Sequence, residues 1–200
     1  MLTPPLYTLR HMVGILEALD IPYLVGGSVA SVALSEPRST NDVDIVVDLR
    51  EENVVDFLIA LEDDFYAEEE MIRDAISLKS SFNLILLRTM IKVDVFVCEA
   101  NAWTESEFSR KHQLDLGITG EPVLAWLPSA EDVILQKLAW YRLGGEVSER
   151  QWRDVQGVLK VQAENLDYDY LKKWAIFRNV SDLLLRAVHE ASLITNINPL

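Results

Sequence analysis

A short run in the first fifty residues places two carboxylates in an otherwise strand-forming segment. Residues 41–48 read NDVDIVVD, and the valines and isoleucine predict a β-strand. Side chains two positions apart leave a strand on the same face, so Asp42 and Asp44 are expected together, with Val43 and Ile45 opposite. Two carboxylates on one face repel each other unless a cation lies between them. The pattern therefore favours a cation site on a β-sheet.

A third carboxylate lies in a later strand-forming run, KVDVFV, at Asp94. Three carboxylates on neighbouring strands can hold Mg²⁺ or Mn²⁺, since hard cations prefer oxygen ligands. Lys92 precedes Asp94 by two residues and is expected on the same face. Two interpretations stay open for Lys92: it neutralises Asp94 through a salt bridge, or it reaches a phosphate itself.

The glycines that follow the short apolar run PYLV predict a strand-to-helix turn at Gly26, Gly27 and Ser28. Such a turn leaves backbone N–H groups and the positive end of a helix facing outward, with no side chain in the way of a phosphate. Together with the carboxylates it would hold a nucleoside triphosphate. Arg38 and Thr40, just before the acidic pair, either bind phosphate or hold the loop.

Periodicity along the chain predicts an α/β (α+β) fold, a small mixed sheet flanked by helices with a helical C-terminal part. Ser129, with Asp132 three residues later, predicts a helix start. We expect a core over residues 1–127 and a helical subdomain over residues 128–200, packed on the core. The expected elements are a helix from Pro4 to about Asp20, strands at 22–25, 43–49, 81–87 and 92–97, helices from Ser28 and from Glu51, and helices at 130–143, 149–162, 168–178 and 180–192.

The composition narrows the set of partners. The formal net charge is −14, and residues 1–100 hold 18 acidic and 7 basic side chains. An acidic surface disfavours broad, sequence-independent DNA or RNA binding, although a local basic groove could still guide one RNA end. Cys98 is the single cysteine, which excludes an intrachain disulfide. No run of about 18 apolar residues occurs, so the sequence predicts a cytoplasmic protein with no membrane segment.

The order VGGS, then NDVDIVV, then VDV resembles the nucleotidyltransferase superfamily with the DNA polymerase β fold, over residues 8–98. Two later segments, EDVILQKLAWYR and RQWRDVQGVL, are similar in type to segments of minimal nucleotidyltransferases and AbiE-type toxins. In those proteins a helical lysine and a later aspartate contribute to the site.

The resemblance implies a role for each matching residue. Gly26, Gly27 and Ser28 would form the phosphate-binding turn, and Lys137 would lie against the triphosphate, with Asp154 as the later aspartate. Asp42, Asp44 and Asp94 would bind Mg²⁺ or Mn²⁺, and Asp94 can also position or deprotonate the acceptor hydroxyl. For Lys137 the alternative is an alkyl chain lying along the edge of its helix. For Asp48 a helix cap or a solvated carboxylate is the better account.

The implied reaction moves a nucleoside monophosphate from ATP or CTP to an acceptor hydroxyl and releases pyrophosphate. The acceptor is a protein side chain, an RNA 3′ end or a small molecule. In one form of this hypothesis the enzyme is a toxin that acts with a separate antitoxin. The alternatives are a noncatalytic nucleotide-binding protein that keeps the fold and an interaction subunit that binds no nucleotide.

Overall fold

The computed structural model describes residues 2–35, 40–117 and 121–191, and the chain divides into two compact units. The first unit contains residues 1–29 and 39–127, and the second contains residues 30–38 and 128–200. The division assigns residues 30–38 to the helical unit, whereas the sequence analysis placed them in the core. The organisation into two folding domains stays a prediction.

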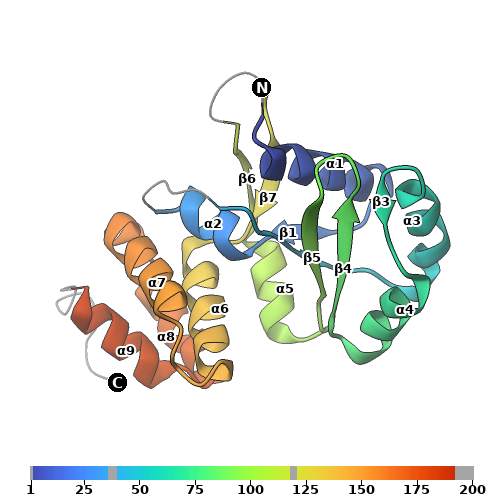
Figure 1. The fold of residues 1–200 in the computed structure, drawn as a ribbon. Coiled ribbons are helices and arrows are strands. Elements are labelled where there is room, and N and C mark those ends of the chain that lie inside the picture. Colours follow the sequence, from blue (N-terminus) through green and yellow to red (C-terminus); the bar gives the residue numbers. More distant parts are fainter. Residues whose placement is uncertain (1, 36–39, 118–120, 192–200) are drawn as a thin grey trace. The chain divides into compact units, whose positions relative to one another are not determined.

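The first unit contains a five-stranded mixed sheet (Figure 1), so the predicted fold class is confirmed. The strands follow the spatial order β1-β2-β5-β4-β3. Only β2 and β5 pair in parallel; the other neighbours are antiparallel. The strands are β1 (Tyr23–Val25), β2 (Val43–Val47), β3 (Phe65–Tyr66), β4 (Ser81–Leu86) and β5 (Ile91–Val97).

The central strands have one apolar face and one more polar face. Val43 and Ile45 of β2, and Val93 and Val95 of β5, have no exposed surface. The residues between them alternate with this buried row and are more exposed, as at Asp44, Lys92 and Asp94. This is the period-two pattern of a sheet that packs on a core with one face only. It leaves a charged patch on the second face.

Helices and a small hairpin complete the first unit. Helix α1 packs against β2 and β5, and α4 packs against β4 and β5. The sequence analysis did not predict β3, α5 or the β6–β7 hairpin, although Asn101, whose side chain caps α5 by accepting from the Thr104 N–H, was a readable start signal. These elements are α1 (Pro4–Ala18), the 3₁₀ turn η1 (Glu51–Asn53), α3 (Val54–Leu61), α4 (Glu69–Leu78), α5 (Ala102–Ser109), β6 (His112–Asp115) and β7 (Leu124–Leu127). Helix α2 (Gly27–Ala33) begins in the first unit, and its residues from Ala30 onward are assigned to the second.

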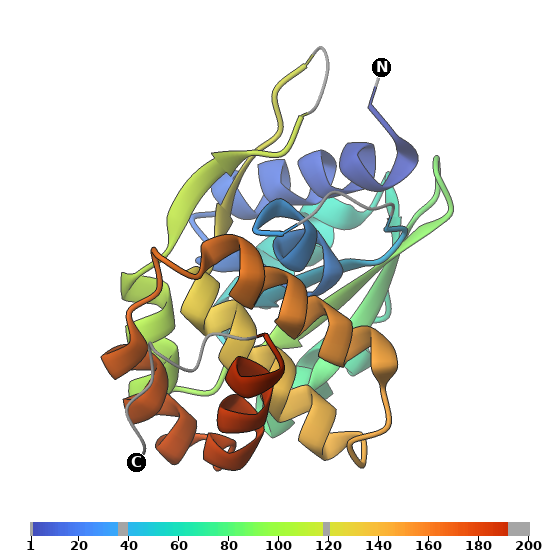
Figure 2. The same cartoon turned by 90° about the vertical axis from the view of Figure 1, so that its left-hand side faces the viewer.

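The C-terminal helices of the second unit pack together (Figure 2, yellow to red). They are α6 (Ala130–Leu143), α7 (Glu149–Gln162), α8 (Tyr168–Phe177) and α9 (Ser181–Glu190). The predicted bounds of α6 and α7 are confirmed, while α8 and α9 end earlier than expected. Among the described residues, no helix is both long and apolar enough to cross a bilayer.

A buried polar network holds the start of α6. Asp132 has no exposed surface and accepts hydrogen bonds from Ser129 Oγ at 2.8 Å and from the Tyr170 hydroxyl at 2.7 Å. The Ser129 side chain in turn accepts from the Asp132 N–H, as the sequence pattern predicted. Because buried polar groups are costly when unpaired, this network ties the first turn of α6 to α8.

Candidate active site

Asp44 and Asp94 are direct neighbours across the parallel pair at the centre of the sheet. In the register of β2 and β5, Asp44 is the partner of Asp94. Both side chains lie on the face opposite the buried valine rows, and both are half-buried. A strand pairing therefore brings together two carboxylates that are separated by fifty positions in the chain.

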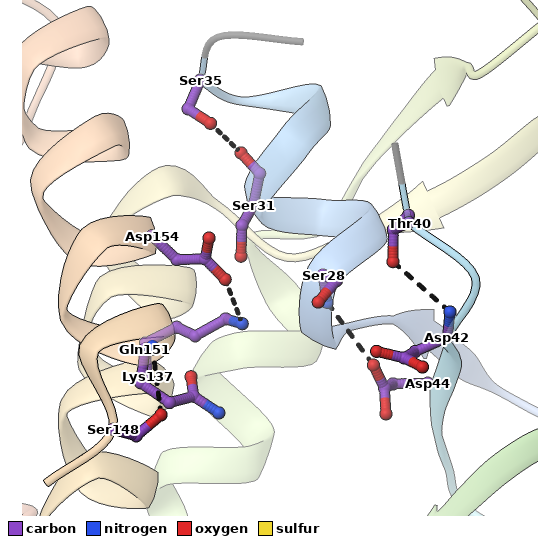
Figure 3. A network of polar contacts seen from close by, with 10 residues as sticks. All are labelled: Ser28, Ser31, Ser35, Thr40, Asp42, Asp44, Lys137, Ser148, Gln151 and Asp154. Atoms are coloured by element: carbon purple, nitrogen blue, oxygen red, sulfur yellow. Dashed lines mark hydrogen bonds and ion pairs between the residues drawn. The ribbon is translucent and has the colours of Figure 1, made fainter. Parts of the chain in front are cut away.

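Asp42 lies one residue before β2, which begins at Val43 as predicted, so the expectation that Asp42 and Asp44 both lie within this strand is wrong. Its N–H faces the Thr40 hydroxyl at 3.4 Å, and the residue is exposed. Aspartate favours such local contacts over a strand ladder. Figure 3 shows the carboxylates of Asp42 and Asp44 pointing from this segment toward the start of α2. Thr40 thus contacts the loop next to Asp42, while Arg38 lies outside the described residues.

The glycine turn is shaped around the Asp44 carboxylate. Gly27 has φ +54°, and a Cβ built there would lie 1.7 Å from Asp44 Oδ2. The Ser28 N–H faces the same oxygen at 3.4 Å (Figure 3), and the Gly26 N–H donates to the Asp44 carbonyl at 2.9 Å. The sequence analysis interpreted the missing side chains as room for a phosphate. The room at Gly27 is taken by Asp44, and the phosphate-binding role of the turn stays a prediction.

Lys92 forms a salt bridge with Asp94, the β5 neighbour of Asp44. Its Nζ is 2.8 Å from Asp94 Oδ1, with 56 % of the Lys92 side chain and 22 % of the Asp94 side chain exposed. The hydrogen bond with Asp94 raises the pKa of the Lys92 ammonium, and the charges of Asp94, Asp42 and Asp44 add to the rise against a smaller opposing effect of burial. Lys92 is therefore a cation at neutral pH. The salt bridge anticipated from the sequence is present.

The carboxylates do not form a complete metal centre. Across residues 2–35, 40–117 and 121–191, no group of three or more His, Cys, Asp and Glu side chains is placed to hold a metal ion. Asp42 and Asp44 supply the hard oxygen donors that Mg²⁺ and Mn²⁺ prefer, so their chemistry fits a divalent cation. Asp94 does not fit in the same way, because Lys92 is bonded to its Oδ1.

Lys137, predicted to bind nucleotide, belongs to the second unit and lies on α6. Its Nζ donates to Asp154 Oδ2 at 2.8 Å (Figure 3), and each side chain is 5 % exposed. The interpretation of Lys137 as an alkyl chain at the helix edge is wrong, because the whole side chain is buried. The two residues that the resemblance linked do contact each other, and the contact is a buried ion pair.

Asp48 pairs with Arg50 rather than with Lys92, the partner of Asp94. Its oxygens accept from Arg50 Nε at 3.3 Å and from Arg50 Nη2 at 2.7 Å. The Arg50 side chain is 61 % exposed. This solvated pair agrees with the sequence-based account of Asp48 and makes the residue a suitable control for Asp44.

Comparison with known proteins shows the fold of the chain. No family model and no curated protein matches it. A crystal structure of ANT(2'')-Ia in complex with adenylyl-2''-tobramycin has TM-score 0.57 and 12% identity, covering 88% of this chain and 98% of that one. A solution structure of the antibiotic-resistance factor ANT(2'')-Ia has TM-score 0.55 and 14% identity, covering 92% and 97%. An antigenic nucleotidyltransferase-like protein from Paracoccidioides brasiliensis has TM-score 0.48 and 18% identity, covering 77% and 73%. The chain shares its fold with the two ANT(2'')-Ia structures, and the likeness at these identities concerns the fold alone.

The contact at Gly27 predicts an unusually costly alanine substitution. Gly27→Ala meets both the left-handed backbone, worth about 1–2 kcal/mol, and the Asp44 carboxylate. Gly145, with φ +74° and nothing within 4 Å of its missing Cβ, is a matched control that meets the backbone cost alone. In urea unfolding we expect Gly27→Ala to lose more stability than Gly145→Ala. Equal losses would mean that the Asp44 contact adds no constraint.

The Lys137–Asp154 pair predicts a stability effect with a second readout. Lys137→Met leaves Asp154 buried without this partner, and breaking a buried pair costs about 3–5 kcal/mol. The double variant Lys137→Met/Asp154→Leu should recover most of this loss, because both charges are gone. Urea unfolding measures both variants. A stable double variant that has lost ATP affinity would instead assign Lys137 to the triphosphate.

Proposed function

We propose that this protein is a nucleotidyltransferase that moves a nucleoside monophosphate from a nucleoside triphosphate to an acceptor hydroxyl and releases pyrophosphate. The observation that carries the proposal is the pairing of Asp44 with Asp94 across β2 and β5, with Asp42 beside them and the glycine turn closed around Asp44. Paired carboxylates at such a turn suit a reaction in which positioning and charge neutralisation supply most of the catalysis.

The carboxylates divide the chemistry between them. Asp42 and Asp44 would hold Mg²⁺ or Mn²⁺, which when bound offsets the charge of the triphosphate oxygens. Asp94 would accept the hydrogen of the acceptor hydroxyl while that oxygen forms its bond to the α-phosphorus. The bond from the α-phosphorus to pyrophosphate breaks in the same displacement. The turn at Gly26, Gly27 and Ser28 is the proposed contact of the triphosphate, and the nucleotide-binding role of Lys137 stays a prediction.

The acceptor that we favour is a small cationic molecule with hydroxyl groups. Residues 1–100 carry 18 acidic and 7 basic side chains, a net charge of 7 − 18 = −11. Such a field attracts cations and repels a phosphate backbone. The ANT(2'')-Ia structure, of which the alignment covers 98%, contains an adenylylated tobramycin. An RNA end and a protein acceptor, including the toxin and antitoxin version, are supported by neither observation and stay predictions.

The rival function is nucleotide binding without turnover. The observation in its favour is the ion pair of Lys92 with Asp94, which occupies one oxygen of the proposed base. The two functions differ in whether pyrophosphate appears. Calorimetric titration with ATP or CTP in the presence of Mg²⁺ measures binding, and a pyrophosphate-release assay measures turnover.

The deciding experiment pairs that release assay with mass spectrometry of the acceptor. The four ribonucleoside triphosphates are tested with aminoglycosides and other hydroxylated amines, with RNA 3′ ends and with protein. We expect pyrophosphate release together with a nucleotide adduct on a cationic small molecule. An adduct on RNA or protein alone would correct the acceptor. Binding without release across the panel would favour the rival function.

Asp44→Asn tests the mechanism because it keeps the shape of the side chain and removes one charge. We expect transfer to fall at least about a hundredfold, since metal-ion neutralisation supplies several kcal/mol and about 1.4 kcal/mol is worth tenfold in rate. Asp48→Asn makes the same chemical change at the solvated Arg50 pair and should keep transfer within about twofold. Melting curves without metal should be close to wild type for both variants. Full transfer by Asp44→Asn would exclude the proposed site.

A further inference from the structure

Lys92 is the cation that the sheet itself supplies to the carboxylate patch. It lies two residues before Asp94 on β5, and because side chains alternate along a strand, both leave the same face. The adjacent positions of β2 pair in register, Val43 with Val93 and Asp44 with Asp94. The ammonium thus lies toward the first residue of β2, on the side of Asp42, and it is bonded to Asp94 Oδ1 at 2.8 Å.

An ammonium in this position competes with a divalent cation in two ways. It occupies the Asp94 oxygen that a metal would bind, and its positive charge repels a second cation at short range. The Lys92 side chain is 56 % exposed and has four rotatable bonds. The Lys92 side chain is therefore able to leave Asp94. Another cation must then take its place, because its departure leaves Asp42, Asp44 and Asp94 without this counter-ion.

We infer that Lys92 is a positioning residue that keeps Asp94 out of the metal site, so that the divalent cation binds at Asp42 and Asp44 alone. This inference rests on the proposed function, because it assigns Asp94 to the acceptor hydroxyl rather than to a metal. The bond from Lys92 holds Asp94 Oδ1, so Oδ2 is the oxygen that we assign to the acceptor hydroxyl.

The inference distinguishes this chain from a site in which all three carboxylates share the metal. In such a site, removing Lys92 would remove its repelling charge but would add no ligand to the metal. In the site described here, removal of Lys92 releases a third ligand and removes a repelling charge. Lys92→Gln should therefore bind a divalent cation more tightly than the wild-type protein, although the substitution adds no ligand of its own that a hard cation strongly prefers.

The test is a titration of the full chain with Mn²⁺ alone. The electron paramagnetic resonance signal of the free ion measures how much Mn²⁺ is bound. We expect Lys92→Gln to bind Mn²⁺ at least about tenfold more tightly than wild type. Lys92→Arg keeps the charge and should stay within about threefold of wild type. Adding Asp94→Asn to Lys92→Gln should cancel the gain, because the gain is assigned to Asp94. A melting curve in EDTA should show Lys92→Gln below wild type, with a larger recovery on addition of Mn²⁺.

Lys79→Gln is the matched control. Lys79 is an exposed lysine at the end of α4, so the same substitution changes the net charge equally at another place. It should leave Mn²⁺ affinity unchanged. The inference is overturned if Lys92→Gln shifts the affinity by less than about threefold, if Lys79→Gln shifts it as much, or if neither wild type nor Lys92→Gln binds Mn²⁺ at millimolar concentration.

The outcome for Lys92 can be read separately from the outcome for the proposed function. Mn²⁺ binding needs no nucleotide and no acceptor, so a tighter Lys92→Gln variant supports the placement of Lys92 even when no pyrophosphate is released. Conversely, nucleotide transfer by wild type together with an unchanged Mn²⁺ affinity in Lys92→Gln would retain the function and reject the role of Lys92.

Discussion

The parallel pairing of β2 with β5 is the constraint on which the candidate site depends. These two strands are central in the sheet order, and their register places Asp44 beside Asp94. Because side chains alternate with a period of two, a slip of one residue would bury a carboxylate among the valines of the apolar face. The cost of burying that charge and the loss of the valine packing both oppose such a slip. The hydrophobic core thus sets the position of the charged patch.

Around this pair, the protein neutralises its own carboxylates. The start of α2 directs the Ser28 N–H at Asp44, and Lys92 donates to Asp94. Gly27 is needed for the first of these contacts, because a side chain there would collide with the Asp44 carboxylate. The second unit shows the same chemistry in its interior, where Lys137 and Asp154 form a buried pair. Each pairing makes an otherwise unfavourable charge tolerable.

Local sequence patterns determined most of the helices and strands. The alternation of Val43, Asp44 and Ile45 predicted a strand with one polar face, and Ser129 with Asp132 predicted the start of α6. The order of VGGS, NDVDIVV and VDV resembles the nucleotidyltransferase superfamily at the level of the sequence. These features are readable because side-chain periodicity and caps act over a few residues. The two-residue strand β3 and the short helix α5 carry weak periodicity, and the sequence did not reveal them.

Tertiary structure alone decided which distant groups meet. Nothing in the local pattern states that Asp44 pairs with Asp94 rather than with another strand residue, because register arises from packing of the whole sheet. The sequence could place Lys92 near Asp94 but could not choose between a salt bridge and a phosphate contact. It interpreted Gly27 as part of a phosphate-binding turn, which stays a prediction, and it could not show that the Asp44 carboxylate lies where a side chain at Gly27 would be. A glycine in the sequence can indicate that a side chain would not fit at that position. Only the tertiary structure shows which neighbouring atoms would be in the way.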